Sequence, residues 1–163
     1  MVFFIVTMVI LVGVDQLTKY IAVTALAPIG SVNIIPSVLN FTYVENYGAA
    51  FGILQNARWF FLVLALLGVG IIVWFLLKRP HNLLLRSSLS LIAAGALGNA
   101  IDRLFRGFVV DFIQLDFIDF PVFNIADICI CVGAGLLVLY VILFEKKKEE
   151  NHDDTIADGD GNK

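Results

Sequence analysis

Four long apolar segments decide what this chain can fold into. Each approaches the roughly 20 residues that a helix needs to cross the hydrocarbon core of a bilayer. They cover residues 2 to about 26, 59–77, 83 to about 104, and 125–144. Hydrophobic residues make up 60% of the 163-residue chain, against about 45–50% apolar residues in soluble domains. The sequence therefore predicts an integral membrane protein with four transmembrane helices.

The first segment has a competing interpretation, a cleaved signal peptide. Ala25-Leu26-Ala27 has the small-x-small pattern of a cleavage site. However, no Lys or Arg precedes the apolar run, and Ala27 lies well beyond Val14, where the uninterrupted run ends. A signal peptide has a basic start and a cleavage site close behind its apolar core. We therefore expect this segment to be retained as a transmembrane helix.

Basic residues in the short connections predict the orientation of the chain. Lys78, Arg79 and Arg86 lie at the connection between the second and third segments, and residues 146–148 are all Lys. Short loops rich in Lys and Arg stay in the cytoplasm. Both termini are then cytoplasmic, and the first and third connections lie outside. We expect a four-helix membrane domain over 1–144, followed by a disordered, acidic cytoplasmic tail with few apolar residues.

The first outer connection is more than a linker. Residues Ser31–Ile35 and 38–44 are rich in Val, Ile, Thr, Tyr and Phe, and the breaker Pro36 separates them. Such runs are typical of β-strands. Residues 48–54 predict a short helix that lies in the membrane interface. The predicted fold class is an all-α integral membrane protein with four transmembrane helices, a small extracytoplasmic β-sheet and a short interfacial helix.

Charge and cysteine content exclude several classes of protein. Residues 1–144 hold seven Lys or Arg and seven Asp or Glu, and the excess of acid lies in the tail. A neutral body without a basic stripe excludes nucleic-acid binding. Cys129 and Cys131 lie two positions apart on a helix and point away from each other, so we expect no disulfide. His81 and His152 are far from both cysteines, so the sequence predicts no metal site.

Polar residues in apolar segments are the candidates for function, because charge is costly there. In "DQLTK", Asp15 and Lys19 are one helical turn apart and can pair. The structural alternative is a self-neutralised ion pair that makes the helix end tolerable in lipid. In "NYGAAF", Asn46 precedes Gly48. The alternative there is a simple turn, because Asn and Gly both tolerate left-handed backbone geometry.

Two further motifs lie on the third and fourth segments. In "GALGNAIDR", Asn99, Asp102 and Arg103 fall on one helix face, and the small residues before them permit close helix contact. The alternative for Asp102 and Arg103 is an ion pair at the helix end. In "FNIAD", Asn124 and Asp127 stand where an N-cap and an acid in the first turn would stabilise a helix. Capping alone would therefore explain both residues.

The last candidate is Asp111 in "VVDF", which is flanked by five bulky apolar residues near the expected lipid boundary. Asp116 and Asp119 look like ordinary solvated loop acids by comparison. With the predicted orientation, all of the polar motifs lie toward the outer half of the membrane or just above it. Four helices that converge there would form one polar pocket in an apolar setting, which is the default hypothesis for a functional site.

A rival class is a small transporter or proton-conducting subunit, for which intramembrane acids are also natural. It predicts acids spread over the full depth of the bilayer, whereas the inner halves of all four segments lack them. A membrane scaffold without activity would leave the polar cluster unexplained. The sequence therefore favours neither of these two classes.

The five motifs together resemble the lipoprotein signal peptidase family, also called signal peptidase II. In the family's order, the chain carries "DQLTK" (15–19), "NYGAAFG" (46–52), "GALGNAIDR" (95–103), "VVDF" (109–112) and "FNIAD" (123–127). They cover essentially the whole four-helix body without the tail, and no motif position departs from the family's pattern. Each motif is weak alone, but five in order on a four-span chain are highly specific.

The resemblance implies an aspartyl endopeptidase of the bacterial plasma membrane. Such an enzyme removes the signal peptide from a prolipoprotein by cutting just before a cysteine that already carries diacylglycerol. The implied catalytic residues are Asp111 and Asp127. The implied substrate-binding residues are Asn46, Asn99, Arg103 and Asn124. The implied structural support comes from Asp15, Lys19 and Asp102.

The chemistry of two acids agrees with this expectation. Two carboxylates that share an apolar site cannot easily both ionise, so one keeps a proton while the other stays charged. The charged acid can take a proton from water and the protonated acid can donate to the scissile carbonyl, with no cofactor and no metal. The implied partners are the diacylglyceryl-modified prolipoprotein, membrane lipid and inhibitors of the globomycin type. We expect no nucleic-acid partner and a monomer.

Overall fold

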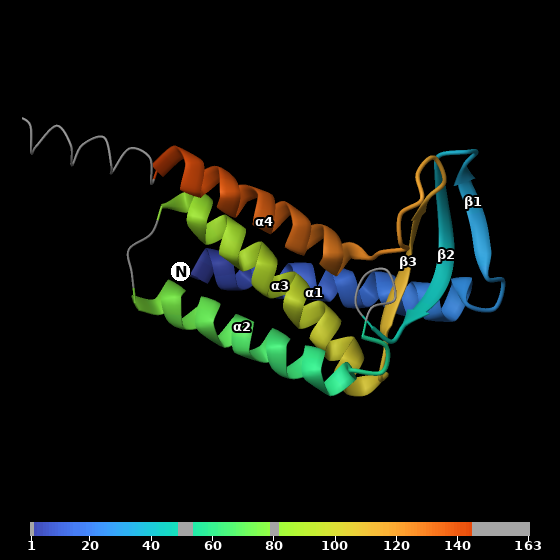
Figure 1. Ribbon diagram of the computed structural model, residues 1–163, viewed down its shortest axis with the longest axis horizontal. Coiled ribbons are helices and arrows are strands. Elements are labelled where there is room, and N and C mark those ends of the chain that lie inside the picture. The colour runs from blue at the N-terminus through green and yellow to red at the C-terminus, as the bar shows by residue number, and fades with distance from the viewer. Residues whose placement is uncertain (1, 49–53, 79–81, 145–163) are drawn as a thin grey trace, which may run out of the picture.

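The computed structural model describes residues 2–48, 54–78 and 82–144 (Figure 1). The predicted tail, 145–163, and most of the predicted interfacial helix, 48–54, lie outside the described residues. Within the described part, the elements follow the order α1, η1, β1, β2, α2, α3, β3 and α4.

In the described part of the chain, four helices are long and apolar enough to cross a membrane, as the sequence predicted. They are α1 (Val2–Ile21), α2 (Arg58–Lys78), α3 (Leu83–Phe105) and α4 (Ile125–Phe144). α1 continues into a single π-helical turn, η1 (Ala22–Leu26), so the first apolar segment ends where it was expected to end. The bounds of α2, α3 and α4 differ from the predicted ranges by at most one residue.

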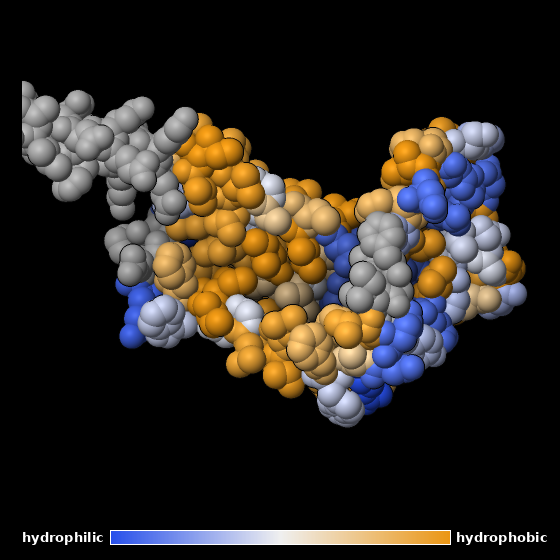
Figure 2. Space-filling model, in the orientation of Figure 1, coloured by the Kyte–Doolittle hydropathy of each residue, from blue (hydrophilic) through white to orange (hydrophobic). Residues whose placement is uncertain are grey.

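α3 is the central helix of the bundle. It packs against α1, α2 and α4 and is the most buried of the four (Figure 1). The other three helices turn large apolar side chains outward: Ile10, Ile71 and Val138 are 58%, 66% and 59% exposed. Figure 2 shows this apolar surface over the helices, with much of the polar surface gathered around the sheet. Soluble proteins rarely expose an apolar surface of this extent, so the outward faces suit lipid.

Small residues bring α3 and α4 into close contact. A Cβ atom added at Gly95 would overlap the carbonyl oxygen of Ala126, and one added at Gly133 would lie 2.8 Å from the carbonyl oxygen of Ser88. Backbones that approach this closely gain van der Waals contact where lipid supplies no hydrophobic driving force between helices. The glycines of "GALGNAIDR" therefore have the packing role that the sequence predicted.

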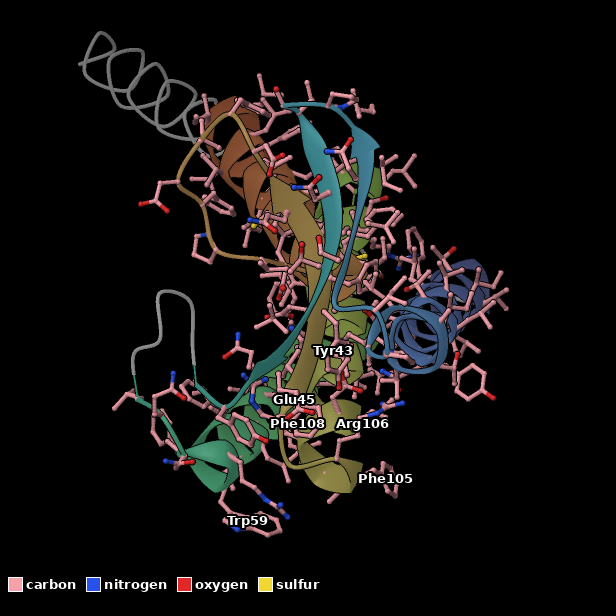
Figure 3. All side chains as sticks on the ribbon, turned by 90° about the vertical axis from the view of Figure 1, so that its right-hand side faces the viewer. Tyr43, Glu45, Trp59, Phe105, Arg106 and Phe108 are labelled. Carbon is pink, nitrogen blue, oxygen red and sulfur yellow. The ribbon has the colours of Figure 1, made fainter. Side chains whose placement is uncertain are left out.

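α2 carries a tryptophan beside a cation near each of its ends. The guanidinium of Arg58 lies 4.4 Å from the ring centre of Trp59, and the ammonium of Lys78 lies 5.2 Å from that of Trp74. Tryptophan and basic residues are typical of the two membrane–water interfaces. Figure 3, which looks onto the sheet end, shows Trp59 and the 78% exposed Phe105 on the same side of the molecule. These aromatic rings mark one expected membrane boundary.

A three-stranded antiparallel sheet lies at one end of the bundle, in the order β1-β2-β3. Its strands are β1 (Ser31–Ile35), β2 (Leu39–Asn46) and β3 (Val109–Leu115). The first two strands confirm the predicted sheet, but β3 was missed, because Asp111 was singled out for its apolar neighbours and no strand was assigned to them. Asp111 instead pairs with Val44 across the sheet. Local patterns did not reveal this strand, since its partner precedes it by two transmembrane helices.

Side-chain hydrogen bonds join all three strands. Asn33 donates to Asn40 at 2.7 Å, and Asn40 donates to Asp116 at 2.6 Å. The hydroxyl of Thr42 bonds to Ser31 at 2.8 Å and donates to Gln114 at 2.6 Å. Such polar cross-strand pairs help to specify the register of a small, exposed sheet.

The sheet is anchored on the end of α1 by a small apolar core. Ala22 and Leu26 of η1 pack with Val110 and Phe112 of β3. Successive side chains of a strand point to opposite faces. Asp111, which stands between Val110 and Phe112, is therefore directed away from this core. The apolar neighbours of Asp111 therefore fix the strand on the core, while the acid itself lies on the opposite face of the sheet.

Candidate active site

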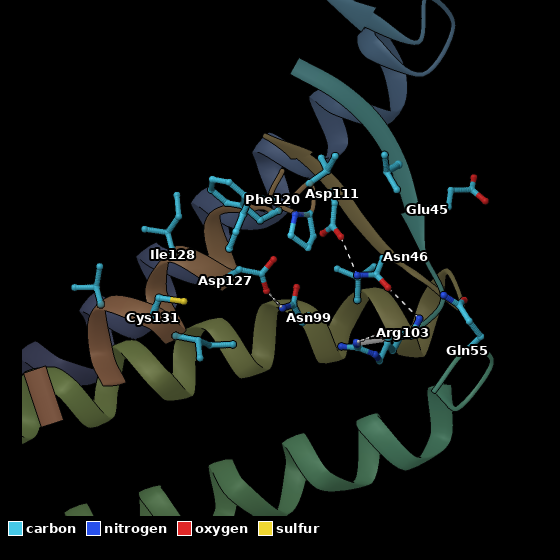
Figure 4. Close-up of a pocket in the computed structure, with 18 residues that line it drawn as sticks. Glu45, Asn46, Gln55, Asn99, Arg103, Asp111, Phe120, Asp127, Ile128 and Cys131 are labelled. Carbon is cyan, nitrogen blue, oxygen red and sulfur yellow. Dashed lines mark hydrogen bonds between the residues drawn. The ribbon is translucent and has the colours of Figure 1, made fainter. Parts of the chain in front are cut away.

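A pocket of about 570 Å³ opens between the sheet, α3 and the start of α4 (Figure 4). Its polar wall includes the expected catalytic pair, Asp111 and Asp127, together with Asn46, Asn99 and Arg103. Its apolar wall consists of the segment before α4 and the first two turns of that helix, with Phe120, Pro121, Val122, Phe123, Ile128, Ile130, Cys131 and Val132. The pocket thus joins a carboxylate pair to an apolar groove.

Asp127 lies in the first turn of α4, where it closes a reciprocal cap with Asn124. The backbone N–H of Asp127 donates to Oδ1 of Asn124 at 3.0 Å, and the N–H of Asn124 donates to Oδ2 of Asp127 at 3.2 Å. The predicted capping is therefore confirmed. It occupies only one carboxylate oxygen, because Oδ1 of Asp127 accepts a hydrogen bond from Asn99 at 2.8 Å. Capping and a place in the pocket are compatible.

Asp111 is 2% exposed and accepts hydrogen bonds on both oxygens. Asn124 donates to Oδ1 at 2.6 Å, and Asn46 donates to Oδ2 at 2.9 Å. Burial, with the charge of Asp127, raises the pKa of Asp111 to about 7, against the opposing effect of the two amides. This carboxyl group therefore changes its protonation near neutral pH.

Asn99 and Asn124 connect the two acids. Asn124 reaches Asp111 with its side-chain nitrogen and caps the turn that holds Asp127. The same nitrogen donates to Oδ1 of Asn99 at 3.2 Å, and Asn99 donates to Asp127. Asn124 is fully buried and Asn99 is 7% exposed. A continuous chain of hydrogen bonds therefore runs from one carboxylate to the other.

A buried ionic cluster lies behind this chain. The fully buried Lys19 makes ion pairs of 3.0 Å with both Asp15 and Asp102. The predicted pairing of Asp15 with Lys19 is therefore confirmed. The alternative pairing of Asp102 with Arg103 is wrong, because Asp102 pairs with Lys19 and, at 2.5 Å, with Arg106. The four charges balance, which makes their burial tolerable.

Asp15 also holds the start of α4. Its Oδ1 accepts the backbone N–H of Ala126 at 2.9 Å, so a carboxylate from α1 caps a free N–H of the fourth helix. This contact fits the positive end of a helix dipole. Gln16, which the sequence analysis did not single out, donates to Asp15 and to the carbonyl of Gly98, both at 3.1 Å. Its place inside "DQLTK" was the available signal.

Arg103 forms part of the opposite wall. Its Nη2 donates to the carbonyl oxygen of Gly48 at 2.9 Å, and its guanidinium lies 4.9 Å from the ring centre of Phe61. The backbone N–H of Gly48 donates to Oδ1 of Asn46 at 3.0 Å, so the side chain of Asn46 closes a bend just after β2. Arg106 was also missed by the sequence analysis, although it lies one helical turn after Asp102.

The remaining candidate residues have ordinary surroundings. Cys129 and Cys131 are both free, as expected, and only Cys131 lines the pocket. Asp116 accepts from Asn40 on the exposed side of the sheet, away from the pocket. Among residues 2–48, 54–78 and 82–144, no three His, Cys, Asp or Glu side chains are grouped as metal ligands would be.

Four membrane-length helices and a buried carboxylate pair in one pocket define a multi-pass membrane protein with an enzyme-like acidic site. A family model described as signal peptidase (SPase) II matches residues 7–143. The chain therefore belongs to the signal peptidase II family.

Similar proteins match most of the chain. A lipoprotein signal peptidase of Symbiobacterium thermophilum is 46% identical over an alignment of 147 residues that covers 88% of this chain and 96% of that protein. One of Haemophilus influenzae is 48% identical over 145 residues, 85% of this chain and 84% of the relative. A solved bacterial membrane enzyme, 40% identical, has a TM-score of 0.82 over 87% of this chain and 88% of its own. Fold and sequence agree in this assignment.

Proposed function

We propose that this chain is an aspartyl endopeptidase that removes the signal peptide from diacylglyceryl-modified prolipoproteins, with Asp111 and Asp127 as the catalytic pair. One observation carries the proposal. Both carboxylates line the same pocket, and N–H donors hold all four of their oxygens. Such an arrangement preorganises two acids that share one site. Membership of the signal peptidase II family supplies the class of substrate.

The proposed reaction needs one ionised and one protonated carboxyl group. Like charges in a buried site favour a single shared proton. The ionised group takes a proton from water as the water attacks the scissile carbonyl carbon. The protonated group donates to the carbonyl oxygen, which gives a neutral gem-diol. As the C–N bond breaks, the first group passes the proton it took from water to the leaving nitrogen, and the second group recovers a proton from a gem-diol hydroxyl. The raised pKa of Asp111 supports such a pair at neutral pH.

The surrounding side chains have separate proposed roles. Asn46, Asn99 and Asn124 already direct their amide nitrogens at the two carboxylates, so we assign them to holding the acids beside the substrate. Arg103 stands in the pocket wall with its planar donor group and is proposed to contact substrate carbonyl oxygens. The structural support comes from Asp15, Lys19 and Asp102.

The shape of the pocket supports a lipid-anchored substrate. Ile128, Cys131 and Val132 extend the pocket from Asp127 along the outward side of α4. A cysteine that carries diacylglycerol keeps its acyl chains in the membrane, so the peptide bond beside it lies at the lipid boundary. We propose that the acyl chains follow this apolar wall while the peptide bond meets the acids.

The proposed location is the bacterial plasma membrane, with both termini in the cytoplasm and the pocket toward the outer face. The sheet and the exposed Trp59 and Phe105 lie at the pocket end of the bundle, as expected for an outer boundary. No cofactor takes part in the proposed reaction.

The test is cleavage of a diacylglyceryl-modified precursor by the purified chain in lipid. Asp111→Asn and Asp127→Asn keep the shape of each side chain but remove its acid–base function. Each should lower kcat by about 10²- to 10⁴-fold or more, as expected for the loss of a general acid or base. Asp116→Asn and Asp119→Asn are the matched controls and should retain turnover. Near-normal turnover by either pocket variant would remove that residue from the catalytic pair.

A further inference from the structure

We propose that Lys19 is a positioning residue for catalysis, which acts through Asn99 to keep hydrogen-bond donors directed at Asp127 and Asp111. This inference rests on the proposed function of the two acids. The ammonium of Lys19 bonds to Asp15, Asp102 and Asn99, and it makes no ion pair or hydrogen bond to Asp111 or Asp127. The positive charge of Lys19 acts on Asp111 only at a distance, where it lowers the pKa of that carboxyl, so its control over the direction of the donors must pass through Asn99.

All three N–H donors of the Lys19 ammonium have an acceptor. It is 0% exposed, and it lies 3.0 Å from Oδ2 of Asp15, 3.0 Å from Oδ2 of Asp102 and 2.8 Å from Oδ1 of Asn99. An ammonium group has three N–H donors and no acceptor. Three acceptors therefore use its whole capacity. Two of them are carboxylates, and the shortest contact is to the neutral amide.

This contact decides which way the Asn99 amide faces. An asparagine amide presents an oxygen on one side and two N–H donors on the other. Because Lys19 can only donate, the oxygen of Asn99 must face it, and the nitrogen then faces Asp127 at 2.8 Å. The reversed amide would set N–H groups against the ammonium and its oxygen against a carboxylate. Both contacts would be repulsive.

The orientation extends to the second acid. Oδ1 of Asn99 accepts a further hydrogen bond from Asn124, and the same Asn124 nitrogen donates to Asp111 at 2.6 Å. Asn124 is itself oriented, because its oxygen accepts the backbone N–H of Asp127. The bond from Asn124 to Asn99 is 3.2 Å, longer than the charged bond from Lys19. Charge-assisted hydrogen bonds are the stronger kind, so Lys19 is the dominant control on Asn99.

The test is a double-mutant cycle between Lys19→Met and Asn99→Leu. The purified variants are compared for kcat and KM on a lipid-modified precursor and for their thermal unfolding midpoint. If Lys19 acts through Asn99, each single variant lowers kcat about tenfold or more with little change in KM. The double variant is then no slower than Asn99→Leu alone, since residues that act as a unit are non-additive. Thr18→Val is the matched control, because that hydroxyl bonds only to the backbone of its own helix.

A second cycle covers the case in which Lys19→Met fails to fold, because it leaves two buried carboxylates without their shared cation. In an Asp15→Asn background, Lys19→Met leaves no buried carboxylate without a cation, since Asp102 keeps its ion pair with Arg106. Multiplying effects of Lys19 and Asn99 on kcat in a folded background would overturn the inference. So would unchanged kcat with a lowered unfolding midpoint, which is the result expected of a purely structural cation.

Asp111→Asn and Asp127→Asn measured alongside separate the two proposals. If both are inactive while Lys19 and Asn99 act independently, only the positioning role is wrong. If either aspartate variant retains turnover, the assignment of the catalytic pair is wrong, and the positioning role of Lys19 is then wrong as well.

Discussion

The side-chain nitrogen of Asn46 on β2 lies 2.9 Å from Oδ2 of Asp111 on β3, so one strand holds the acid of the next. Earlier on β2, the nitrogen of Asn40 lies 2.6 Å from Oδ1 of Asp116. The two pairs share their chemistry and their strand, but only Asn46 and Asp111 line the pocket. The pair of Asn40 and Asp116 can therefore serve as the control for the pair of Asn46 and Asp111.

The first prediction concerns the pH dependence of cleavage. The pKa of Asp111 is raised to about 7, and its hydrogen bond from Asn46 acts to lower it. We expect kcat/KM to fall as the pH rises through about 7, because the pair then loses its shared proton. Asn46→Ala should move this fall to higher pH, whereas Asn40→Ala should leave it in place. Equal shifts in both variants, or none in either, would contradict the role of the Asn46 bond.

The second prediction concerns stability. The folded chain holds the proton of Asp111 more tightly than the unfolded chain, where its pKa is near 3.8. Between pH 4 and about 7 the unfolded state therefore binds fewer protons at this residue, so the free energy of unfolding should fall as the pH rises. Thermal unfolding in lipid or detergent measures this. Asp111→Asn should weaken the pH dependence, and Asp116→Asn should not.

The third prediction concerns Arg103. Arg103→Lys keeps the charge but loses the planar donor group that reaches Gly48 and stacks over Phe61. We expect a loss of about 10- to 100-fold in kcat/KM, the range for losing a hydrogen bond to a charged group. Arg86→Lys, at the other end of α3, should behave like the parent. Parent-like kinetics for Arg103→Lys would reduce its role to positive charge.

The fourth prediction concerns helix packing. A Cβ atom at Gly98 would lie 2.5 Å from Oδ2 of Asp15 and 3.2 Å from the Cβ of Ala126. Gly98→Ala should therefore push the carboxylate away from the start of α4 and lower the stability by about 1–3 kcal/mol. Gly135→Ala meets nothing within 4 Å and serves as the control. Thermal unfolding midpoints should separate the two. An unchanged midpoint for Gly98→Ala would show that the contact yields without cost.

The fifth prediction concerns inhibition, and it follows from the family resemblance. The cyclic lipopeptide globomycin should bind with its tail along the apolar wall at Ile128 and Val132, and with a hydroxyl between the two acids. A hydroxyl can donate to an ionised acid and accept from a protonated one. Binding should weaken in Asp111→Asn, in Asp127→Asn and when the tail is removed. Equal affinity in all four measurements would place the inhibitor elsewhere.

Much of this molecule follows from local sequence patterns. The four helices, the pairing of Asp15 with Lys19 and the cap formed by Asn124 and Asp127 all agree with prediction. Each depends on residues close together in the chain. Helix length, one-turn spacing and capping are set by near neighbours, so the sequence determines them directly.

Tertiary structure decided the rest, because distant segments had to meet. β3 exists only through its pairing with β2, which precedes it by two membrane helices. The partner of Asp102 depends on which face of α3 meets α1, and that choice brings it to Lys19 and leaves Arg103 to the pocket. The one-dimensional pattern placed Asn99, Asp102 and Arg103 on a single face. Packing of three helices around α3 divided that face between a buried ionic cluster and the pocket, since each buried charge must lie where its partner is.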